Sequence, residues 1–333
     1  MIKKLVGLGI LWSWSLSAPA AARIELLNAS YDVSRELFAQ INPAFEAAWR
    51  AQTGQEIAIR QSHGGSSTQA RAVVDGLQAD VVTLNQATDI QFLVKAGLIQ
   101  ADWSTRLPNG ASPCYSFPVL LVRAGNPKHI GDWGDLVRPG VQVVFPNPKT
   151  SGNGRYTYLA AYAYALSRPG ANDVKAREFM GELLANVPVF DTGGRGATTT
   201  FVERQIGDVL ISFESEVNTI QHEYAKAHLQ VVYPSLSVEA DFPVAVVDAV
   251  VNRHHTRAAA QGYLSYLYSD AGQEILAHNF NRVRSEAVLA RHRAEFPAVH
   301  LISVEKTFGD WEQVTRTHFS AGGVLDQLLG SSR

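Results

Sequence analysis

Four short stretches of the chain are rich in glycine and hydroxyl side chains, and each runs directly into a segment with helical periodicity. They are Ser30–Asp32, His63–Ser67, Thr150–Gly154 and Thr192–Gly196. The first turn of a helix presents unpaired backbone N–H groups and a partial positive charge, so it attracts anions. Glycine lets the backbone approach a ligand closely, and Ser66 and Ser151 add hydroxyl donors beside such glycines. Four such turns predict a site that holds an anion with uncharged donors rather than with lysines.

Each turn taken singly is also an ordinary helix cap, because Ser, Asp and Gly at helix starts contribute about 1 kcal/mol. A second alternative is an exported serine hydrolase that uses Ser66 or Ser151 as its nucleophile. The stretch His63–Gly65 resembles the oxyanion loop of lipases. However, the chain contains no Gly-x-Ser-x-Gly nucleophile elbow, and His63 is the only imidazole close to these serines in sequence.

Other site chemistries have weaker support. The chain contains no P-loop and no Gly-x-Gly-x-x-Gly motif after a strand. The pair His254–His255 lacks the Cys, His and carboxylate spacing of a metal site, so we expect surface histidines at a helix start, and neither a metal nor a cofactor. Cys114 is the only cysteine, which excludes an intrachain disulfide, and we expect it to be a buried small hydrophobic residue.

The first 20 residues have the pattern of a secretory signal peptide, with Lys3 and Lys4 before an apolar stretch from 5 to 16. Cleavage after Ala20, or after Ala22, would leave an exported chain of about 310 residues, a length typical of two domains. Removing both lysines changes the formal net charge from −2 to −4. Without a basic excess, nucleic acid is not a predicted partner.

Strands and helices alternate between these turns. Strands are predicted at Glu56–Arg60, Asp80–Leu84, Pro118–Arg123, Gln142–Phe145, Asp208–Ser212, Leu229–Val232 and Phe242–Asp248. Helices are predicted at Ser67–Leu77, Asp89–Ala96, Tyr156–Leu166, Asp173–Ala185, Arg257–Tyr268 and Gly272–His278. Within Asp32–Trp49, Pro43 is expected to interrupt the helix, with Asn42 capping a second segment. Apolar strands between helices indicate an α/β fold with mostly parallel sheets, which bind ligands beyond the carboxyl ends of their strands.

The motifs at these turns resemble the periplasmic sulfate-binding proteins of ABC transporters over nearly the whole mature chain. The matching stretches are Leu26–Asp32, Gln61–Ser66, Ala79–Leu84, Pro146–Gly152, and Gly193–Gly196 followed by Thr200–Arg204. The resemblance implies a two-lobed clamshell of the type II-like periplasmic binding proteins, in which each lobe is a mostly parallel sheet flanked by helices. It implies a first lobe from 21–115 plus 241–333, a second lobe from 116–240, and an anion in the cleft between them.

The resemblance also implies which groups hold the anion. Backbone N–H groups would come from Asp32, Ser66, Gly152, Asn153 and Gly194, and a hydroxyl would come from Ser151. The family places a tryptophan indole N–H at the position of Phe213, which cannot donate. We therefore expect Phe213 to weaken sulfate binding or to shift the preference toward thiosulfate, whose terminal sulfur tolerates an apolar wall.

Three charged residues lie in or beside these turns, and we expect each of them to contact the protein rather than the anion. We expect the side chain of Asp32 to cap the following helix at Ser34 or Arg35, because a carboxylate aimed at an anion would repel it. We expect Arg155 and Arg195 to pair with carboxylates such as Asp191 rather than to bind the anion directly.

The function implied is that of a monomeric, non-enzymatic binding protein that captures sulfate or thiosulfate and delivers it to an ABC permease. Another oxyanion such as molybdate is a further alternative, although the Ser62–Ser66 stretch disfavours it. A sensory role for the same fold also stays open.

Overall fold

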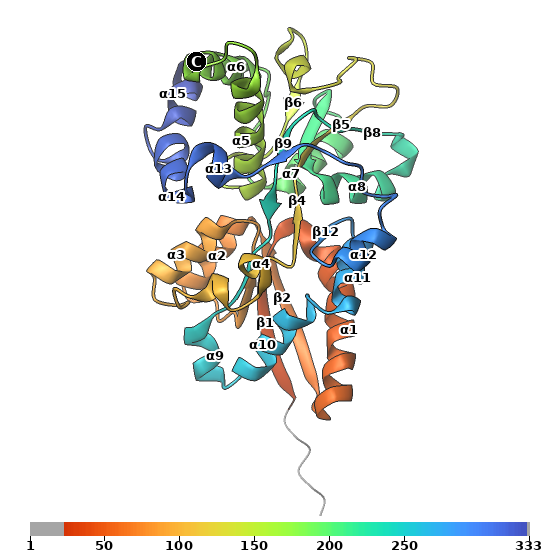
Figure 1. Cartoon of the computed structure of the whole chain (residues 1–333), viewed down its shortest axis with the longest axis vertical. Coiled ribbons are helices and arrows are strands. Elements are labelled where there is room, and N and C mark those ends of the chain that lie inside the picture. Colours follow the sequence, from red (N-terminus) through yellow and green to blue (C-terminus); the bar gives the residue numbers. More distant parts are fainter. Residues whose placement is uncertain (1–22, 332–333) are drawn as a thin grey trace, which may run out of the picture.

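Short apolar strands form the centres of two separate sheets. In the computed structural model, which describes residues 23–331, β3 (Val81–Thr83), β5 (Pro118–Val122) and β7 (Val209–Phe213) are buried along their whole length. Helices on both sides of a sheet bury its strands in this way. The two sheets belong to two α/β lobes that are stacked along the long axis of the molecule (Figure 1). The predicted signal peptide and its cleavage site lie outside the described residues.

The first lobe contains a four-stranded sheet in the order β11-β3-β1-β2. Its strand β1 (Ile24–Tyr31) pairs in parallel with β2 (Ile57–Gly64) and with β3, while β11 (Val244–Val246) is antiparallel to β3. The carboxyl ends of β1, β2 and β3 therefore lie at one edge of the sheet. This arrangement confirms the mostly parallel sheet that was predicted for this lobe.

The second lobe contains the sheet β6-β7-β5-β8, in which β6 is Val143–Val144 and β8 is Gln230–Val232. Only the β6–β7 pair is parallel, and β5 is antiparallel to both β7 and β8. The expectation of a mostly parallel sheet was wrong for this lobe. The reason is that β5 enters directly from the first lobe and runs away from it, whereas β6 and β7 run back toward it.

Helices cover both sheets, and their bounds agree with the predictions to within a few residues for most elements. They are α1 (Arg35–Thr53), α2 (Ser66–Val74), α3 (Ala87–Lys95), α4 (Pro108–Ala111), α5 (Gly152–Ser167), α6 (Asp173–Ala185), α7 (Gly194–Thr198), α8 (Glu214–Glu223), α9 (Asp248–His254), α10 (Arg257–Tyr266), α11 (Asp270–His278) and α12 (Glu286–Arg291). Within the described chain, no helix is both long enough and apolar enough to span a membrane.

Helix α1 continues through Pro43 without a break, so the predicted second segment is absent. Proline in a helix removes one backbone hydrogen bond. The helix nevertheless buries Leu37, Phe38, Ile41 and Phe45 on one face, and this packing holds it together. Asn42 does not cap a helix, because its Oδ1 accepts hydrogen bonds from Tyr263 Oη at 2.7 Å and from Gln61 Nε2 at 3.2 Å.

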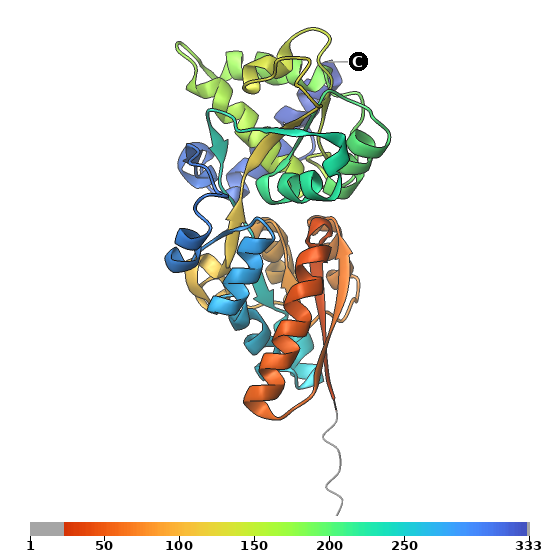
Figure 2. The same ribbon diagram turned by 90° about the vertical axis from the view of Figure 1, so that its right-hand side faces the viewer.

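Three stretches of chain connect the lobes (Figures 1 and 2). The first runs through β4 (Cys114–Ser116) into β5, and the second runs from β9 (Ser237–Val238) into β10 (Ala240–Asp241). The third leaves β12 (Arg282–Val283) and α12 of the first lobe and reaches β13 (Leu301–Ile302), which pairs with β9. The first two lie at the lobe boundaries that the resemblance implies, after residues 115 and 240. The third was not predicted.

The C-terminal segment packs on the second lobe, as Figure 1 shows. It contains α13 (Val304–Phe308), α14 (Trp311–Val314) and α15 (Val324–Ser331). Lys149 forms an ion pair with Asp326 at 2.8 Å, and the Oη of Tyr158 lies 3.2 Å from the Nδ1 of His318. This arrangement differs from the expected first-lobe assignment of residues 241–333. We propose the division 23–116 with 240–297, and 117–239 with 298–331.

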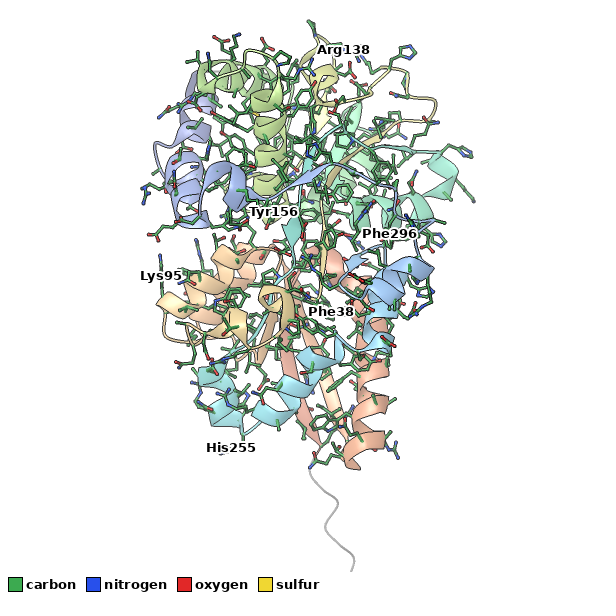
Figure 3. The ribbon with its side chains drawn as sticks, viewed as in Figure 1. Phe38, Lys95, Arg138, Tyr156, His255 and Phe296 are labelled. Carbon is green, nitrogen blue, oxygen red and sulfur yellow. The ribbon has the colours of Figure 1, made fainter. Side chains whose placement is uncertain are left out.

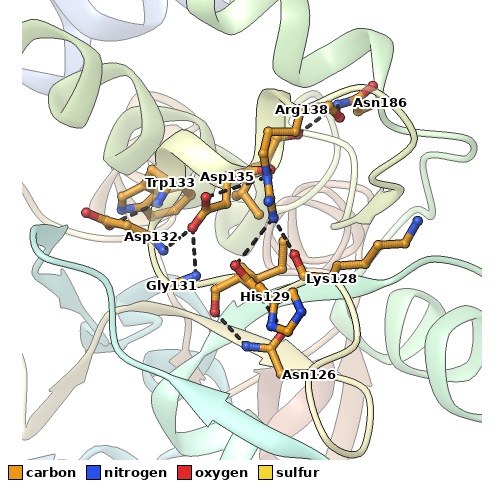
Figure 4. A network of polar contacts seen from close by, with 11 residues as sticks. Asn126, Lys128, His129, Gly131, Asp132, Trp133, Asp135, Arg138 and Asn186 are labelled. Carbon is orange, nitrogen blue, oxygen red and sulfur yellow. Dashed lines mark hydrogen bonds and ion pairs between the residues drawn. The ribbon is translucent and has the colours of Figure 1, made fainter.

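The loop between β5 and β6 is fixed by side chains that bond to its own backbone (Figure 4). Asp132 accepts from the backbone N–H of Trp133 at 2.9 Å, and Asp135 accepts from the N–H of Gly131 at 2.7 Å. Asn186, which follows α6, donates to the carbonyl of Leu136 at 2.8 Å. These contacts tie the loop to α6 and fix the chain that enters β6, the strand before the third glycine-rich turn.

Candidate functional site

The four predicted turns meet where the two lobes face each other. The carboxyl ends of β1 and β2 point toward the second lobe, and those of β6 and β7 point toward the first. A Cβ atom built on Gly65 would lie 3.4 Å from the carbonyl oxygen of Thr150 and 3.8 Å from that of Thr192. A Cβ built on Gly193 would lie 2.7 Å from the Oδ2 of Asp32. The structure therefore brings the turns together from both lobes, as predicted.

Both predicted serines are buried at the starts of helices. Ser151 precedes α5, and its Oγ accepts from the backbone N–H of Gly154 at 3.4 Å. That bond uses a lone pair and leaves the hydroxyl hydrogen of Ser151 available for a ligand. Ser66 begins α2, and its Oγ accepts from the backbone N–H of Asn85 at 3.3 Å. Within residues 23–331, neither hydroxyl is hydrogen-bonded to a histidine.

Gly152 has a structural reason to be glycine. A Cβ at this position would lie 2.2 Å from the Oδ1 of Asn85 and 2.8 Å from the Cγ of Gln86. Contacts this short require the side chains of Asn85 and Gln86, or the lobes themselves, to shift. Asn85 and Gln86 follow β3 and were not predicted as site residues, although they stand directly beyond the carboxyl end of a parallel strand. Their position after a predicted strand is the sequence feature that could have identified them as site residues.

The side chain of Asn153 is bound within the second lobe. Its Nδ2 donates to Ser212 Oγ at 2.7 Å and to Glu216 Oε2 at 3.1 Å. Its Oδ1 accepts from Thr157 Oγ1 at 3.3 Å. The side chain is thus engaged by β7, α8 and α5, and the backbone N–H in the first turn of α5 is the group of this residue that remains for an anion.

Glu216, on α8, is a buried carboxyl that the sequence analysis did not identify. Its Oε1 accepts from Thr198 Oγ1 at 3.0 Å, and its Oε2 also contacts the hydroxyl of Ser212. A Cβ built on Gly194 would lie 3.0 Å from Oε2, so this carboxyl lies directly behind the fourth turn. Burial, with a smaller contribution from the charge of Asp32, raises the pKa of Glu216 to about 7, against the hydrogen bonds from Ser212 and Thr198.

Asp32 does not cap its own helix, so that expectation was wrong. Neither the 3-10 turn Asp32–Ser34 nor α1 has a side-chain cap, and the Oδ2 of Asp32 accepts instead from the backbone N–H of Arg195 at 3.3 Å. The physical reason is that the start of the helical segment at Gly194 on the opposite lobe offers free N–H groups. Burial raises the pKa of Asp32, and the bond from the Arg195 amide opposes this rise.

Phe213 ends β7 and has no exposed surface. Its ring centroid lies 6.0 Å from that of Tyr156 and 5.2 Å from that of Phe242. Tyr156 lies where the second lobe approaches the first (Figure 3), and Phe242 follows β10 on a connecting stretch. Phe213 therefore belongs to an aromatic cluster at the junction and offers no polar group to a ligand.

The two arginines pair with carboxylates, but with partners on the opposite lobe rather than with Asp191. Arg195 Nη2 lies 3.3 Å from Glu36 Oε1. Arg155 lies 3.8 Å from Asp89, and its Nη1 donates to Gln86 Oε1 at 2.5 Å. These contacts span the two lobes, so both guanidinium groups help to hold the lobes together.

Possible metal ligands lie away from this site. Within residues 23–331, Glu274, His278 and His292 bring ligand atoms within 4.8 Å of one another. Arg291 Nη2 already lies 2.5 Å from Glu274 Oε1, so we assign this group to an ion-pair network. The pair His254–His255 stands at the end of α9 and not at a helix start, and His254 lies 3.1 Å from Asp80. Cys114 is buried as expected, and burial raises the pKa of its thiol to about 12.

Comparison with known proteins fits this geometry. Residues 26–280 match a family described as bacterial extracellular solute-binding protein. The chain belongs to this family. A thiosulfate-binding protein from Pseudomonas aeruginosa is 55% identical over 94% of this chain and 95% of its own length. A sulfate-binding protein from Escherichia coli is 46% identical over 97% and 98%, respectively.

A solved structure of the same kind gives the fold. The sulfate-binding protein SubI from Mycobacterium tuberculosis superposes with a TM-score of 0.80 at 32% identity, over 89% of this chain and all of that one. The two-lobed α/β architecture of this family is therefore also that of the present chain.

Proposed function

We propose that this protein binds sulfate or thiosulfate between its lobes and delivers the anion to an ABC permease. The observation that carries the proposal is the meeting of four glycine-rich turns from both lobes. The donors would be the backbone N–H groups of Asp32, Ser66, Gly152, Asn153 and Gly194, and the hydroxyl of Ser151. The relatives named for thiosulfate and sulfate support this anion class over molybdate.

Sulfate and thiosulfate are dianions that only accept hydrogen bonds at neutral pH, so a site lined with donors suits them. A hydrogen bond to a charged group contributes about 1.5–3 kcal/mol. Six of them are sufficient for micromolar affinity after the costs of ordering and closure. A protonated phosphate would bring an O–H without a partner, at a cost of about 1–3 kcal/mol.

Among the two anions we propose thiosulfate as the preferred one. Phe213 offers an apolar wall in place of a donor, and the terminal sulfur of thiosulfate is a weaker acceptor than oxygen. The higher identity to the thiosulfate-binding relative supports the same preference. We further propose a periplasmic, monomeric protein without catalytic activity. Within residues 23–331, Ser66 and Ser151 accept from backbone N–H groups and are not bonded to an imidazole, which supports binding over hydrolysis.

A calorimetric titration of the mature protein with thiosulfate, sulfate, phosphate and molybdate tests this proposal. We expect micromolar or tighter binding of thiosulfate, weaker binding of sulfate, and no binding of the other two. A ligand that binds only the folded state also raises its melting temperature, so a thermal-shift panel provides an independent measurement. Absence of binding of both sulfur oxyanions, or turnover of a chromogenic ester, would contradict the proposal.

A further inference from the structure

Gln86 carries a buried donor that the structure leaves without a partner. The residue follows β3 and has no exposed surface. Its Oε1 accepts from Arg155 Nη1 at 2.5 Å and from Thr88 Oγ1 at 3.1 Å. Because Oε1 accepts from both donors, the orientation of the carboxamide is fixed, and Nε2 lies on the side away from them. Nε2 has no hydrogen-bond partner within the described part of the chain.

The side chain of Gln86 lies against the first residue of α5. A Cβ built on Gly152 would lie 2.8 Å from its Cγ, so the carboxamide belongs to the surface that faces the third turn. The neighbouring Oδ1 of Asn85 is also buried without a partner, but an oxygen acceptor cannot bond an anion. A buried N–H group without a partner is rare and costly, and a ligand that accepts its hydrogen would remove that cost.

We infer that Gln86 Nε2 donates a hydrogen bond to the dianion bound at the N-terminus of α5. This inference rests on the proposed function and adds a side-chain donor from the first lobe, whose other proposed donors, at Asp32 and Ser66, are backbone N–H groups. Because Nε2 only donates, it adds to the discrimination against oxyanions that carry a proton.

Arg155 acts on this contact indirectly, as a positioning residue. Its guanidinium bonds to Gln86 Oε1 and, through Nε, to the carbonyl of Pro148 at 3.0 Å. Arg155 thus orients the carboxamide with Oε1 toward the guanidinium. Because Arg155 belongs to the second lobe, this orientation depends on the contact between the two lobes.

Two substitutions separate the donor from the shape of the side chain. Q86E keeps an oxygen for Arg155 and Thr88 but replaces Nε2 with an acceptor, so we expect thiosulfate affinity to fall by well over tenfold with the melting temperature of the free protein retained. Q86M keeps the length but removes both polar ends, and we expect a loss of about tenfold or more. Q91M is the matched control, because Gln91 is exposed on helix α3, which Gln86 directly precedes, and we expect wild-type affinity.

Calorimetric titration with thiosulfate and with sulfate gives the result. Wild-type affinity in Q86E and Q86M overturns the inference and leaves the proposed function intact. A loss in Q86M that accompanies a lower melting temperature, with normal binding by Q86E, shows a structural role and overturns it as well. Absence of binding by the wild-type protein itself instead contradicts the proposed function.

Discussion

The Nδ2 of Asn153 lies 3.1 Å from the Oε2 of Glu216, and this bond joins the first turn of α5 to a carboxyl that has almost no contact with solvent. Thr198 bonds to the other oxygen of the same carboxyl. One acidic side chain therefore holds both helical turns that the second lobe presents to the first. Its ionisation in a buried position works against folding.

Replacing this carboxyl should change how stability depends on pH. The folded pKa of about 7 exceeds the ordinary value of 4.5, so the folded state keeps a proton that the unfolded state loses. The contribution of Glu216 to the free energy of unfolding is fully present below pH 4.5 and is lost as the pH rises to about 7. We therefore compare the free energy of unfolding of E216Q with that of the wild type. The value for E216Q minus the value for the wild type should be roughly 3 kcal/mol larger at pH 8 than at pH 4.

Denaturant unfolding of both proteins at several pH values measures this difference. E223Q is a matched control, because Glu223 is an exposed residue at the end of the same helix. Parallel stability curves for the wild type and E216Q would contradict the prediction.

Adding one methyl group at Gly152 should obstruct closure of the lobes. The new Cβ would lie 2.2 Å from Asn85 Oδ1 and 2.8 Å from Gln86 Cγ, so these side chains or the lobes must shift. Overpacking typically costs 1–3 kcal/mol, so we expect G152A to weaken anion binding about ten- to hundredfold. Calorimetry with thiosulfate measures the loss. G181A in α6 serves as the control, because its Cβ would lie an ordinary 3.9 Å from Leu328. Full affinity in G152A would refute the close approach.

Introducing a donor at Phe213 should change the anion preference. An indole N–H can bond an oxygen of sulfate, so we expect F213W to strengthen sulfate binding about tenfold and thiosulfate binding less. F213L tests for an effect of side-chain size without a donor and should not gain sulfate affinity. The ratio of the two dissociation constants is the measured quantity. If that ratio is unchanged in a folded F213W protein, position 213 does not control selectivity.

Removing the guanidinium of Arg195 should have a small effect. Its ion pair with Glu36 is partly exposed, with 51% and 36% of the side chains accessible, and pairs of this kind contribute about 0.2–1 kcal/mol. We expect R195A to weaken binding by less than about fivefold, and E36Q to have a similar effect. Loss of all binding in R195A, with E36Q normal and both proteins folded, would mean that the guanidinium contacts the anion itself.

The turns could be predicted from the sequence because their chemistry is local. Ser151 caps α5 with its side chain, and Gly65 and Gly193 stand at the N-cap positions of α2 and α7, so these residue types mark the helix starts. Helix α6 likewise has the predicted bounds, since Asn172 caps its start with a bond to the N–H of Lys175.

Features that depend on which segments meet could not be predicted in this way. The roles of Gln86 and Glu216 follow from contacts with residues 69 and 63 positions away along the chain, respectively. The two-residue strands β12 and β13 exist only because β4 and β9 lie beside them. Pro43 does not interrupt α1, because the packing of the helix outweighs one missing backbone hydrogen bond.

The placement of the C-terminal helices on the second lobe puts the two ends of the described chain at opposite extremes of the molecule (Figure 1). Fluorophores attached near residues 24 and 331 would lie on different lobes, so energy transfer between them would report a change in the distance between the lobes. The sole native thiol is buried, so cysteines introduced for such dyes would react without competition from it. The architecture thus lends itself to an optical sensor for its own ligand.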